Sequence, residues 1–284
     1  MPAKLAILAL LAAFTVAYAA VFASALRRAP ISPIPSPLHV ATGFVTNFFD
    51  TLGIGSFATS TAFFKLRRLV PDHLMPGTLN VGHTLPTMLQ AFIYVAAIEV
   101  DVLTLVLLIA SAVVGAWIGA GLVTALPRRT VQRCMGGTLL VAAVAMLMRQ
   151  LDLFPAGGVA LELRGWHLAT GVIGNFFFGA VSTLGIGFYA PCMTMVSLLG
   201  MNPAAAFPIM MGSSAFLMPV ASARFAWSQA FVAPVSAGLA LGGLAGVPLA
   251  AFAVQSLPLT ALRWLVIVVV LYAALLMLRS PTEE

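Results

Sequence analysis

The chain has 284 residues, of which 61% are hydrophobic and only 8% are charged. These ionisable side chains are too few to cover a soluble particle of this size, so composition excludes a soluble globular enzyme. The 14 Lys and Arg residues outnumber the 8 Asp and Glu residues, but they stand singly or in pairs between apolar stretches. That arrangement indicates orientation signals at a membrane surface rather than a nucleic-acid-binding face.

Nine apolar segments are long enough to enter or cross a membrane. They cover 5–26, 38–64, 77–98, 101–126, 131–149, 166–199, 204–223, 228–256 and 259–278. The longest polar connections, 27–37 and 150–164, are too short to hold a separate soluble core. The sequence therefore predicts one all-α integral membrane domain.

The first segment has two interpretations. Lys4 precedes an apolar run, and Ala23-Ser24-Ala25 resembles the cleavage site of a signal peptide. The run from Leu5 to Phe22 is longer than the roughly 7 to 15 residues usual in such a peptide. A retained N-terminal transmembrane helix over 1–28 is therefore favoured.

Comparison of the chain with itself reveals a duplication. A shift of 132 residues aligns Thr51-Leu52-Gly53-Ile54-Gly55 with Thr183-Leu184-Gly185-Ile186-Gly187, and the same shift aligns Pro71 with Pro203. Apolar composition alone does not readily produce five consecutive identities and aligned prolines in one register. We therefore predict two homologous repeats, 38–149 and 166–279, behind one extra N-terminal helix.

The positive-inside rule tests how the two repeats are oriented. If all nine segments cross fully, the better orientation places eight Lys and Arg residues inside and six outside. If 38–64 and 166–199 instead enter, turn at their glycines and leave on the same side, ten lie inside and four outside. Each repeat then has three full crossings, so the favoured model predicts inverted repeats, as in many secondary transporters. Nine spans, and seven spans with two re-entrant hairpins, both remain open at this stage.

The duplicated glycines predict an anion site. Gly53 and Gly55, with Gly185 and Gly187, allow the backbone to turn sharply inside each broken segment. The N-terminus of a broken helix exposes N–H groups and a partial positive charge that attract an anion. The alternative is that these glycines only permit close helix packing.

Polar side chains close to both motifs complete the candidate site, although Ser and Thr in apolar helices often bond only to their own backbone. The candidate substrate-binding residues are Asn47, Thr51, Gly53, Gly55, Ser56, Asn175, Ser182, Thr183, Gly185, Gly187 and Tyr189. The candidates for a second wall, on the proline-led helices that follow, are Asn80, His83, Ser213 and Ser214.

Two titratable residues in these apolar stretches are candidates for proton coupling. An ionisable group such as Asp50 is costly inside a membrane and suggests function. The alternative is a carboxyl held by backbone donors at the edge of a cavity. His83 could bind an anion or carry a proton, or it could only join helices by hydrogen bonds.

Other kinds of site are not expected. No cluster of His, Cys, Asp and Glu has metal-ligand spacing, no Ser-His-Asp arrangement is suggested, and no phosphate-binding loop precedes a Lys. We therefore expect no enzyme activity, no cofactor and no metal. Two series of glycines are expected to serve close helix packing: Gly115, Gly119 and Gly121, and Gly238, Gly242, Gly243 and Gly246.

The duplicated Gly-Ile-Gly within a broken helix, the proline-led helix after it and the small size resemble the TauE/SafE sulfite exporter family. The resemblance covers about 38–279 and implies a multi-pass transporter of the bacterial inner membrane that moves sulfite, organosulfonates or related small anions. The chain departs from the family pattern, which commonly continues into further glycines. Here Ser56 follows Gly55 and Phe188 follows Gly187, and bulk at this second position points to a larger or less polar anion.

We expect a secondary transporter that exports a small sulfur-containing anion, driven by the membrane potential or a proton gradient. Its expected partners are the anionic substrate and membrane lipid, with no nucleic acid, and a homodimer is left open. The main alternative is a non-transporting membrane scaffold or assembly factor. That alternative predicts polar residues on outer helix faces and no central cavity.

Overall fold

The computed structural model describes residues 2–123, 151–153, 157–182 and 188–253, together with isolated helical positions between 130 and 150 and between 264 and 278. Among these residues the regular structure is helical, and β-structure is limited to an isolated bridge between Ala160 and Met201. The predicted all-α architecture is therefore confirmed for the described residues. The predicted segments 131–149 and 259–278 lie mostly outside them.

The elements recur in the same order along the chain. The first group is α1 (Pro2–Arg27), α2 (Pro37–Thr51), α3 (Ser56–Arg67), the 3₁₀ turn η1 (Asp72–Leu74), α4 (Met75–Ala97) and α5 (Val102–Val123). The second group is α7 (Gly165–Ser182), α8 (Tyr189–Leu198), η2 (Pro203–Ala205), α9 (Ala206–Trp227) and α10 (Ala233–Ala253). The starts of η2, α9 and α10 follow those of η1, α4 and α5 by 131 residues in each case.

Length and hydropathy identify four described helices that can cross a membrane. These are Lys4–Arg27 in α1, Val102–Gly119 in α5, Pro203–Trp227 across η2 and α9, and Ala233–Phe252 in α10. The 15 residues of α2 and the 12 of α3 span only about 22 and 18 Å. Because the hydrocarbon core is about 30 Å thick, neither α2 nor α3 crosses it alone.

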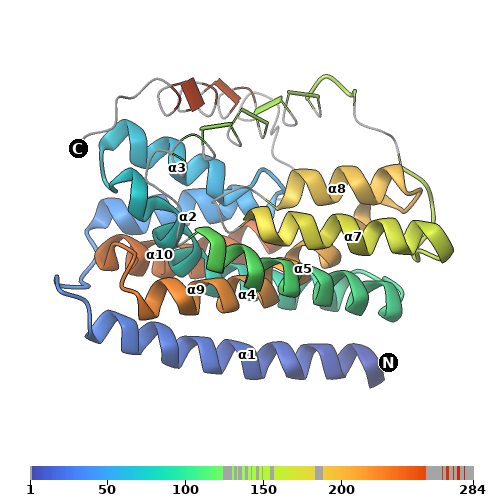
Figure 1. The fold of residues 1–284 in the computed structure, drawn as a ribbon, viewed down its shortest axis with the longest axis horizontal. Coiled ribbons are helices and arrows are strands. Elements are labelled where there is room, and N and C mark those ends of the chain that lie inside the picture. Colours follow the sequence, from blue (N-terminus) through green and yellow to red (C-terminus); the bar gives the residue numbers. More distant parts are fainter. Residues whose placement is uncertain are drawn as a thin grey trace.

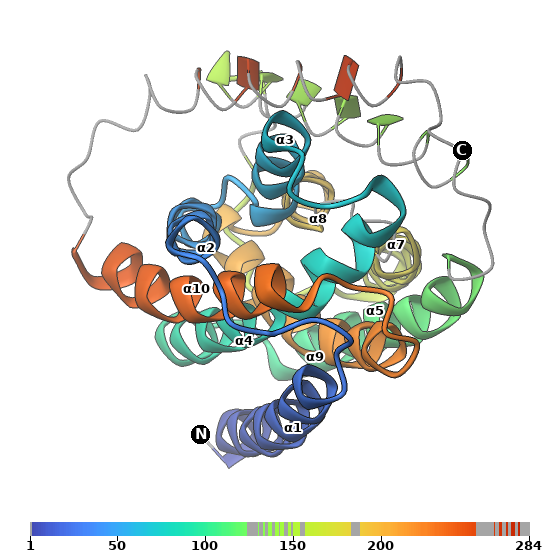
Figure 2. The same ribbon diagram turned by 90° about the vertical axis from the view of Figure 1, so that its left-hand side faces the viewer.

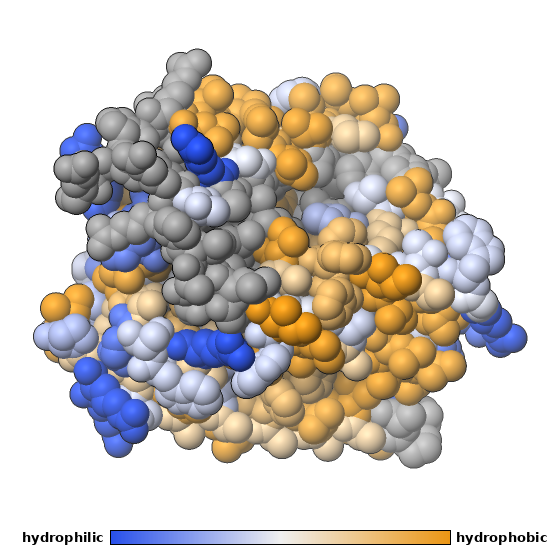
Figure 3. Space-filling model, in the orientation of Figure 1, coloured by the Kyte–Doolittle hydropathy of each residue, from blue (hydrophilic) through white to orange (hydrophobic). Residues whose placement is uncertain are grey.

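The surface has the polarity of a membrane protein. Large apolar side chains are exposed on several helices, among them Val16 on α1, Trp117 on α5 and Phe252 on α10. Figure 3 shows a mainly hydrophobic face with hydrophilic residues gathered toward its left and right ends. Since most helices run between these two ends (Figure 1), the apolar residues on this face lie over their middle parts.

Local sequence signals set where α2 begins. The Ser36 side chain accepts a hydrogen bond from the His39 backbone N–H, and the Ser36 N–H is bonded to His39 Nδ1. Pro37 occupies the first turn, where its missing N–H has no consequence. This reciprocal cap fixes the start of α2.

Helices of the first group pack mainly against helices of the second group. The most extensive packing of α2 is against α10, and that of α7 is against α5, while α4 and α9 pack together centrally. The first helix lies against both α4 and α9. Figure 2 places α2 and α7 on opposite sides, with α3 and α8 between them and α1 outside. Neither group can therefore form its helix contacts alone.

Glycines make these exchanged contacts close. A Cβ at Gly242 of α10 would overlap the Val40 backbone of α2, and one at Gly119 of α5 would overlap the Ala180 backbone of α7. Gly43 of α2 faces the backbone of α10 in the same way. The four-residue spacing of these glycines therefore serves helix packing, as predicted.

Gly242→Ala should lower the thermal stability of the purified protein, because the new methyl group meets fixed backbone rather than a movable side chain. Overpacking of this kind costs about 1–3 kcal/mol. The measurement is thermal unfolding in detergent. The matched control is Gly137→Ala, since a Cβ at Gly137 meets nothing within 4 Å. Equal transition temperatures for both variants would contradict the packing assigned to Gly242.

Candidate functional site

The chain reverses between α2 and α3 at the first glycine motif. The N–H of Gly53 donates to Asp50 O at 2.8 Å, and that of Ile54 donates to Phe49 O at 3.0 Å. This is the bonding of a Schellman motif, which requires a left-handed residue after the helix, and Gly53 has φ 81°. Gly55 has φ 91°, and α3 begins at the next residue. Both conformations favour glycine, so the motif positions the start of α3.

Asp50 lies at the centre of this region and is 1% exposed. One carboxyl oxygen, Oδ1, accepts the backbone N–H of Ser56, the first residue of α3. The other, Oδ2, is 2.9 Å from Gln90 Nε2 of α4 and 3.2 Å from the Tyr189 hydroxyl, which belongs to the first residue of α8. A single carboxyl therefore joins the starts of α3 and α8 to α2 and α4.

Gln90 extends the network. Its Nε2 also donates to Thr51 Oγ1 at 3.0 Å, and its Oε1 accepts from the Tyr189 hydroxyl at 3.0 Å. The Thr51 hydroxyl itself donates to Asn47 O, and the Thr51 carbonyl accepts from the Tyr94 hydroxyl. These bonds pair the polar groups at the end of α2 with side chains of α4.

A narrow cavity adjoins Asp50. The centre of a water-sized molecule can occupy about 30 Å³ of this cavity. The surrounding atom-free space is roughly 360 Å³ and is partly open to the outside. Its lining comes from six helices and the residues that precede α3 and α8: Asp50, Gly55, Ser56, Phe57, Asn80, Thr87, Ser182, Phe188, Tyr189, Ser214, Leu217 and Met218. One or two water molecules fit this space in the present conformation.

The lining contains hydroxyl, amide and carboxyl groups but no Lys or Arg among the described residues. The nearest basic residue of α3, Lys65, pairs with Asp72 at 2.7 Å on the outer side of the helix. Within the described lining, charge in the cavity can be balanced only by hydrogen bonds, helix dipoles and protons. Among the described residues, no group of three or more His, Cys, Asp and Glu side chains could hold a metal.

Several expected site residues lie outside this lining. Asn47 donates to Gly43 O, and its Oδ1 is 3.0 Å from His83 Nδ1, whose other ring nitrogen is 2.9 Å from Ser60 Oγ. All three side chains of this Asn47–His83–Ser60 chain are fully buried. It therefore joins α2, α4 and α3 by hydrogen bonds rather than facing the cavity.

The second half contributes differently from the first. Asn175 of α7 donates to Leu108 O of α5 and to Ser213 Oγ of α9, and its Oδ1 has no partner although the residue is fully buried. Ser182 lines the cavity and bonds to Gly179 O. Three other candidates, Thr183, Gly185 and Gly187, lie outside the described residues.

The first half of the chain matches a known protein family. Residues 1–147, more than half of the chain, match the family model described as Sulfite exporter TauE/SafE. The chain belongs to the TauE/SafE family. No curated protein and no solved structure gives a significant match. The family match covers α1 to α5, and so includes Asp50, the α2–α3 turn and Gln90.

In this TauE/SafE protein, the sequence alone missed Gln90 and Thr87 and the apolar wall of Phe57, Leu217 and Met218. Gln90 carried a usable signal, because a buried amide in an apolar helix also needs a hydrogen-bond partner. The apolar wall carried none, because Phe, Leu and Met occur throughout the chain. Only the tertiary arrangement that brings α3 and α9 to one cavity selects these three residues.

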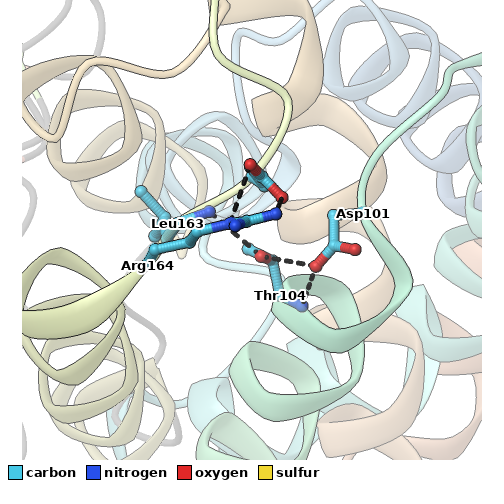
Figure 4. A network of polar contacts seen from close by, with 5 residues as sticks. Asp101, Thr104, Leu163 and Arg164 are labelled. Atoms are coloured by element: carbon cyan, nitrogen blue, oxygen red, sulfur yellow. Dashed lines mark hydrogen bonds and ion pairs between the residues drawn. The ribbon is translucent and has the colours of Figure 1, made fainter.

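A second polar network lies between the start of α5 and the segment before α7, away from the cavity (Figure 4). Asp101 accepts from the N–H and the hydroxyl of Thr104 in the first turn of α5, and Thr104 Oγ1 accepts from Leu163 N–H at 3.1 Å. Arg164 pairs with Glu162, and this hydrogen bond raises the pKa of the exposed Arg164 guanidinium. The network anchors the segment before α7 to the start of α5.

His83→Ala should destabilise the protein, since it leaves Asn47 Oδ1 and the Ser60 hydroxyl buried without partners. Each orphaned group costs about 1–3 kcal/mol. The measurement is the transition temperature in detergent. The control is His167→Ala, a half-exposed histidine, which should change stability by less than about 0.5 kcal/mol. A stability loss confined to His167→Ala would contradict the structural role of His83.

Proposed function

We propose that this TauE/SafE protein is a secondary transporter that binds a small anion, such as sulfite or a short organosulfonate, in the cavity beside Asp50. One observation supports this most directly: the first residues of α3 and α8 both contact the same buried carboxyl. Helix N-termini attract negative charge, and here two of them adjoin one cavity. Ser56, Ser182 and Ser214 supply hydroxyls there, and Asn80 supplies an amide.

Alternating access follows in this proposal from two inverted repeats, the first carrying α2 to α5 and the second α7 to α10. The recurring element order and the exchanged packing of α2 with α10 and α7 with α5 support it. Figure 1 shows α3 toward one end of the molecule and α8 toward the other, which suits repeats of opposite orientation. The substrate would lie where the repeats meet, as in other inverted-repeat transporters.

The narrow cavity fits a closed step of such a cycle. Its present space holds about a water molecule, so an oxyanion enters only if the walls separate. The wall residues belong to different groups of helices, with Asn80 and Thr87 on α4 and Ser214 and Leu217 on α9. Movement of one repeat against the other would therefore widen it.

The bacterial inner membrane is the proposed location, and export is the proposed direction. With the interior negative, the potential favours exit of an anion by about 2.3 kcal/mol per charge per 100 mV. An anion that moves alone therefore leaves the cell without another energy source.

Liposomes containing the purified protein should take up or release labelled sulfite and a short alkylsulfonate faster than protein-free vesicles. The two anions separate a general oxyanion site from one that requires sulfite. Identical rates in both kinds of vesicle, for every anion tried, would remove the transport proposal.

Ser182→Leu should reduce this flux by about tenfold or more, because the larger side chain fills a cavity that holds little more than water. Thr170→Leu is the matched control on the same helix, since Thr170 is exposed and bonds only to Trp166 O. Flux and thermal stability are both measured. Unchanged flux in folded Ser182→Leu protein would show that the anion takes another route.

A further inference from the structure

We infer that Asp50 binds one proton for each anion that enters the cavity, so that transport is proton-coupled through this residue. The inference rests on the proposed function and specifies its energy coupling. It is carried by the count of hydrogen-bond donors around Asp50 and by the position of the carboxyl beside the proposed anion.

The shared Tyr189 hydroxyl favours a protonated Asp50 in this conformation, while the Ser56 N–H and the Gln90 amide donate to the carboxyl in either state. Tyr189 has one hydroxyl proton, but its oxygen lies 3.2 Å from Asp50 Oδ2 and 3.0 Å from Gln90 Oε1. If Asp50 is ionised, Tyr189 can donate to only one of these two acceptors, and the other loses this donor in a buried site. If Asp50 carries a proton on Oδ2, it donates to the Tyr189 oxygen and Tyr189 donates to Gln90.

The orientation of the Gln90 amide follows from its other contacts. The Thr51 hydroxyl gives its proton to Asn47 O, so Thr51 Oγ1 acts as an acceptor toward Gln90. The nitrogen of Gln90 therefore faces Thr51, and its oxygen faces Tyr189. With this orientation, Tyr189 can donate its single hydroxyl proton to Asp50 Oδ2 or to Gln90 Oε1, but not to both.

No positive charge faces Asp50 from the described parts of the elements around it. From α8 it meets Tyr189, and from α4 it meets Gln90, with Tyr94 one turn further along and His83 committed to Asn47 and Ser60. The residues of α10 include no titratable side chain, and Lys65 of α3 is paired with Asp72. An ionised Asp50 would thus be balanced only by hydrogen bonds.

An anion and an ionised Asp50 compete for the same place. Asp50 Oδ1 already accepts the first N–H of α3, and Asp50 itself lines the cavity. Two negative charges there repel strongly where solvent is excluded. A proton on Asp50 removes the repulsion and loosens its hold on the α3 N-terminus. Loss of that proton restores the repulsion and the strong hydrogen bond to the α3 N-terminus, and so expels the anion.

By reciprocity, anion binding then favours proton binding to Asp50 by the same factor as the proton favours the anion. For a monoanion the transported charge is zero, so the membrane potential alone no longer drives the movement. The proton and anion gradients together set the direction. A proton gradient that is acidic outside favours entry, so export by this coupled route requires an outward anion gradient large enough to exceed it.

The first test measures binding-linked proton uptake by the full chain in detergent. The probe is methanesulfonate, whose own charge stays constant over the pH range in which the protein is stable. We expect uptake of about one proton per bound anion, and affinity that weakens by up to about tenfold per pH unit on the alkaline side. Binding that neither takes up protons nor depends on pH would overturn the inference and leave the proposed function standing.

The second test uses liposomes with an imposed proton gradient. The wild-type protein should accumulate methanesulfonate on the alkaline side, and Asp50→Asn that keeps the thermal stability of the wild type should lose this accumulation. Asp101→Asn is the control, because Asn also caps a helix well and Asp101 lies outside the cavity. Accumulation by Asp50→Asn equal to wild type would overturn the inference.

Tyr189→Phe separates positioning from coupling. A protonated Asp50 uses both contacts of the hydroxyl, as its acceptor and as the donor to Gln90, whereas an ionised Asp50 leaves one of them unmade. Removal of the hydroxyl should therefore shift the pH profile of anion binding toward lower pH while proton uptake remains. If Asp50→Asn does not fold, the binding-linked uptake of the wild-type protein still decides the question. Absence of any anion binding or flux in the wild type would instead remove the proposed function and the coupling together.

Discussion

The pairing of polar groups inside an apolar protein is the constraint on which the site depends. The break between α2 and α3 releases backbone groups that water cannot reach, and each needs a partner in the protein. The turn pairs the carbonyls at the end of α2 with Gly53 and Ile54, while Asp50 takes the first N–H of α3. The carboxyl therefore contributes to the backbone structure of the break as well as to the cavity.

The helices of the first group cannot hold this break alone. Gln90 and Tyr189 reach Asp50 from α4 and α8, and α2 is held from its other side by α10 through close glycine contacts. The elements that pair the break thus come from both halves of the chain. A relative movement of the halves would change the partners of Asp50 and the width of the cavity together, which is the relation that coupled transport requires.

The TauE/SafE match and the cavity address different levels of function. Family membership establishes the class of membrane transporter, whereas the chemistry of the cavity bears on what is carried and how it is driven. A lining with hydroxyl and amide donors, two helix starts and a carboxyl suits an oxyanion that arrives with a proton. Phe57, Phe188 and Leu217 form an apolar part of the same lining.

Composition and apolar spacing by themselves determined the all-α membrane class, the helix segments and the packing role of the four-residue glycine series, because these depend on local periodicity and length. The sequence also marked Asp50, Ser56, Ser182 and Tyr189, since polar groups near a glycine motif are conspicuous in apolar surroundings. Only the tertiary structure decided that Asn47 and His83 bond to each other away from the cavity, and that Gln90 and Tyr189 share Asp50. Residues 40 to 139 positions apart meet there through helix packing, and no local pattern in the chain specifies which buried donor reaches which acceptor.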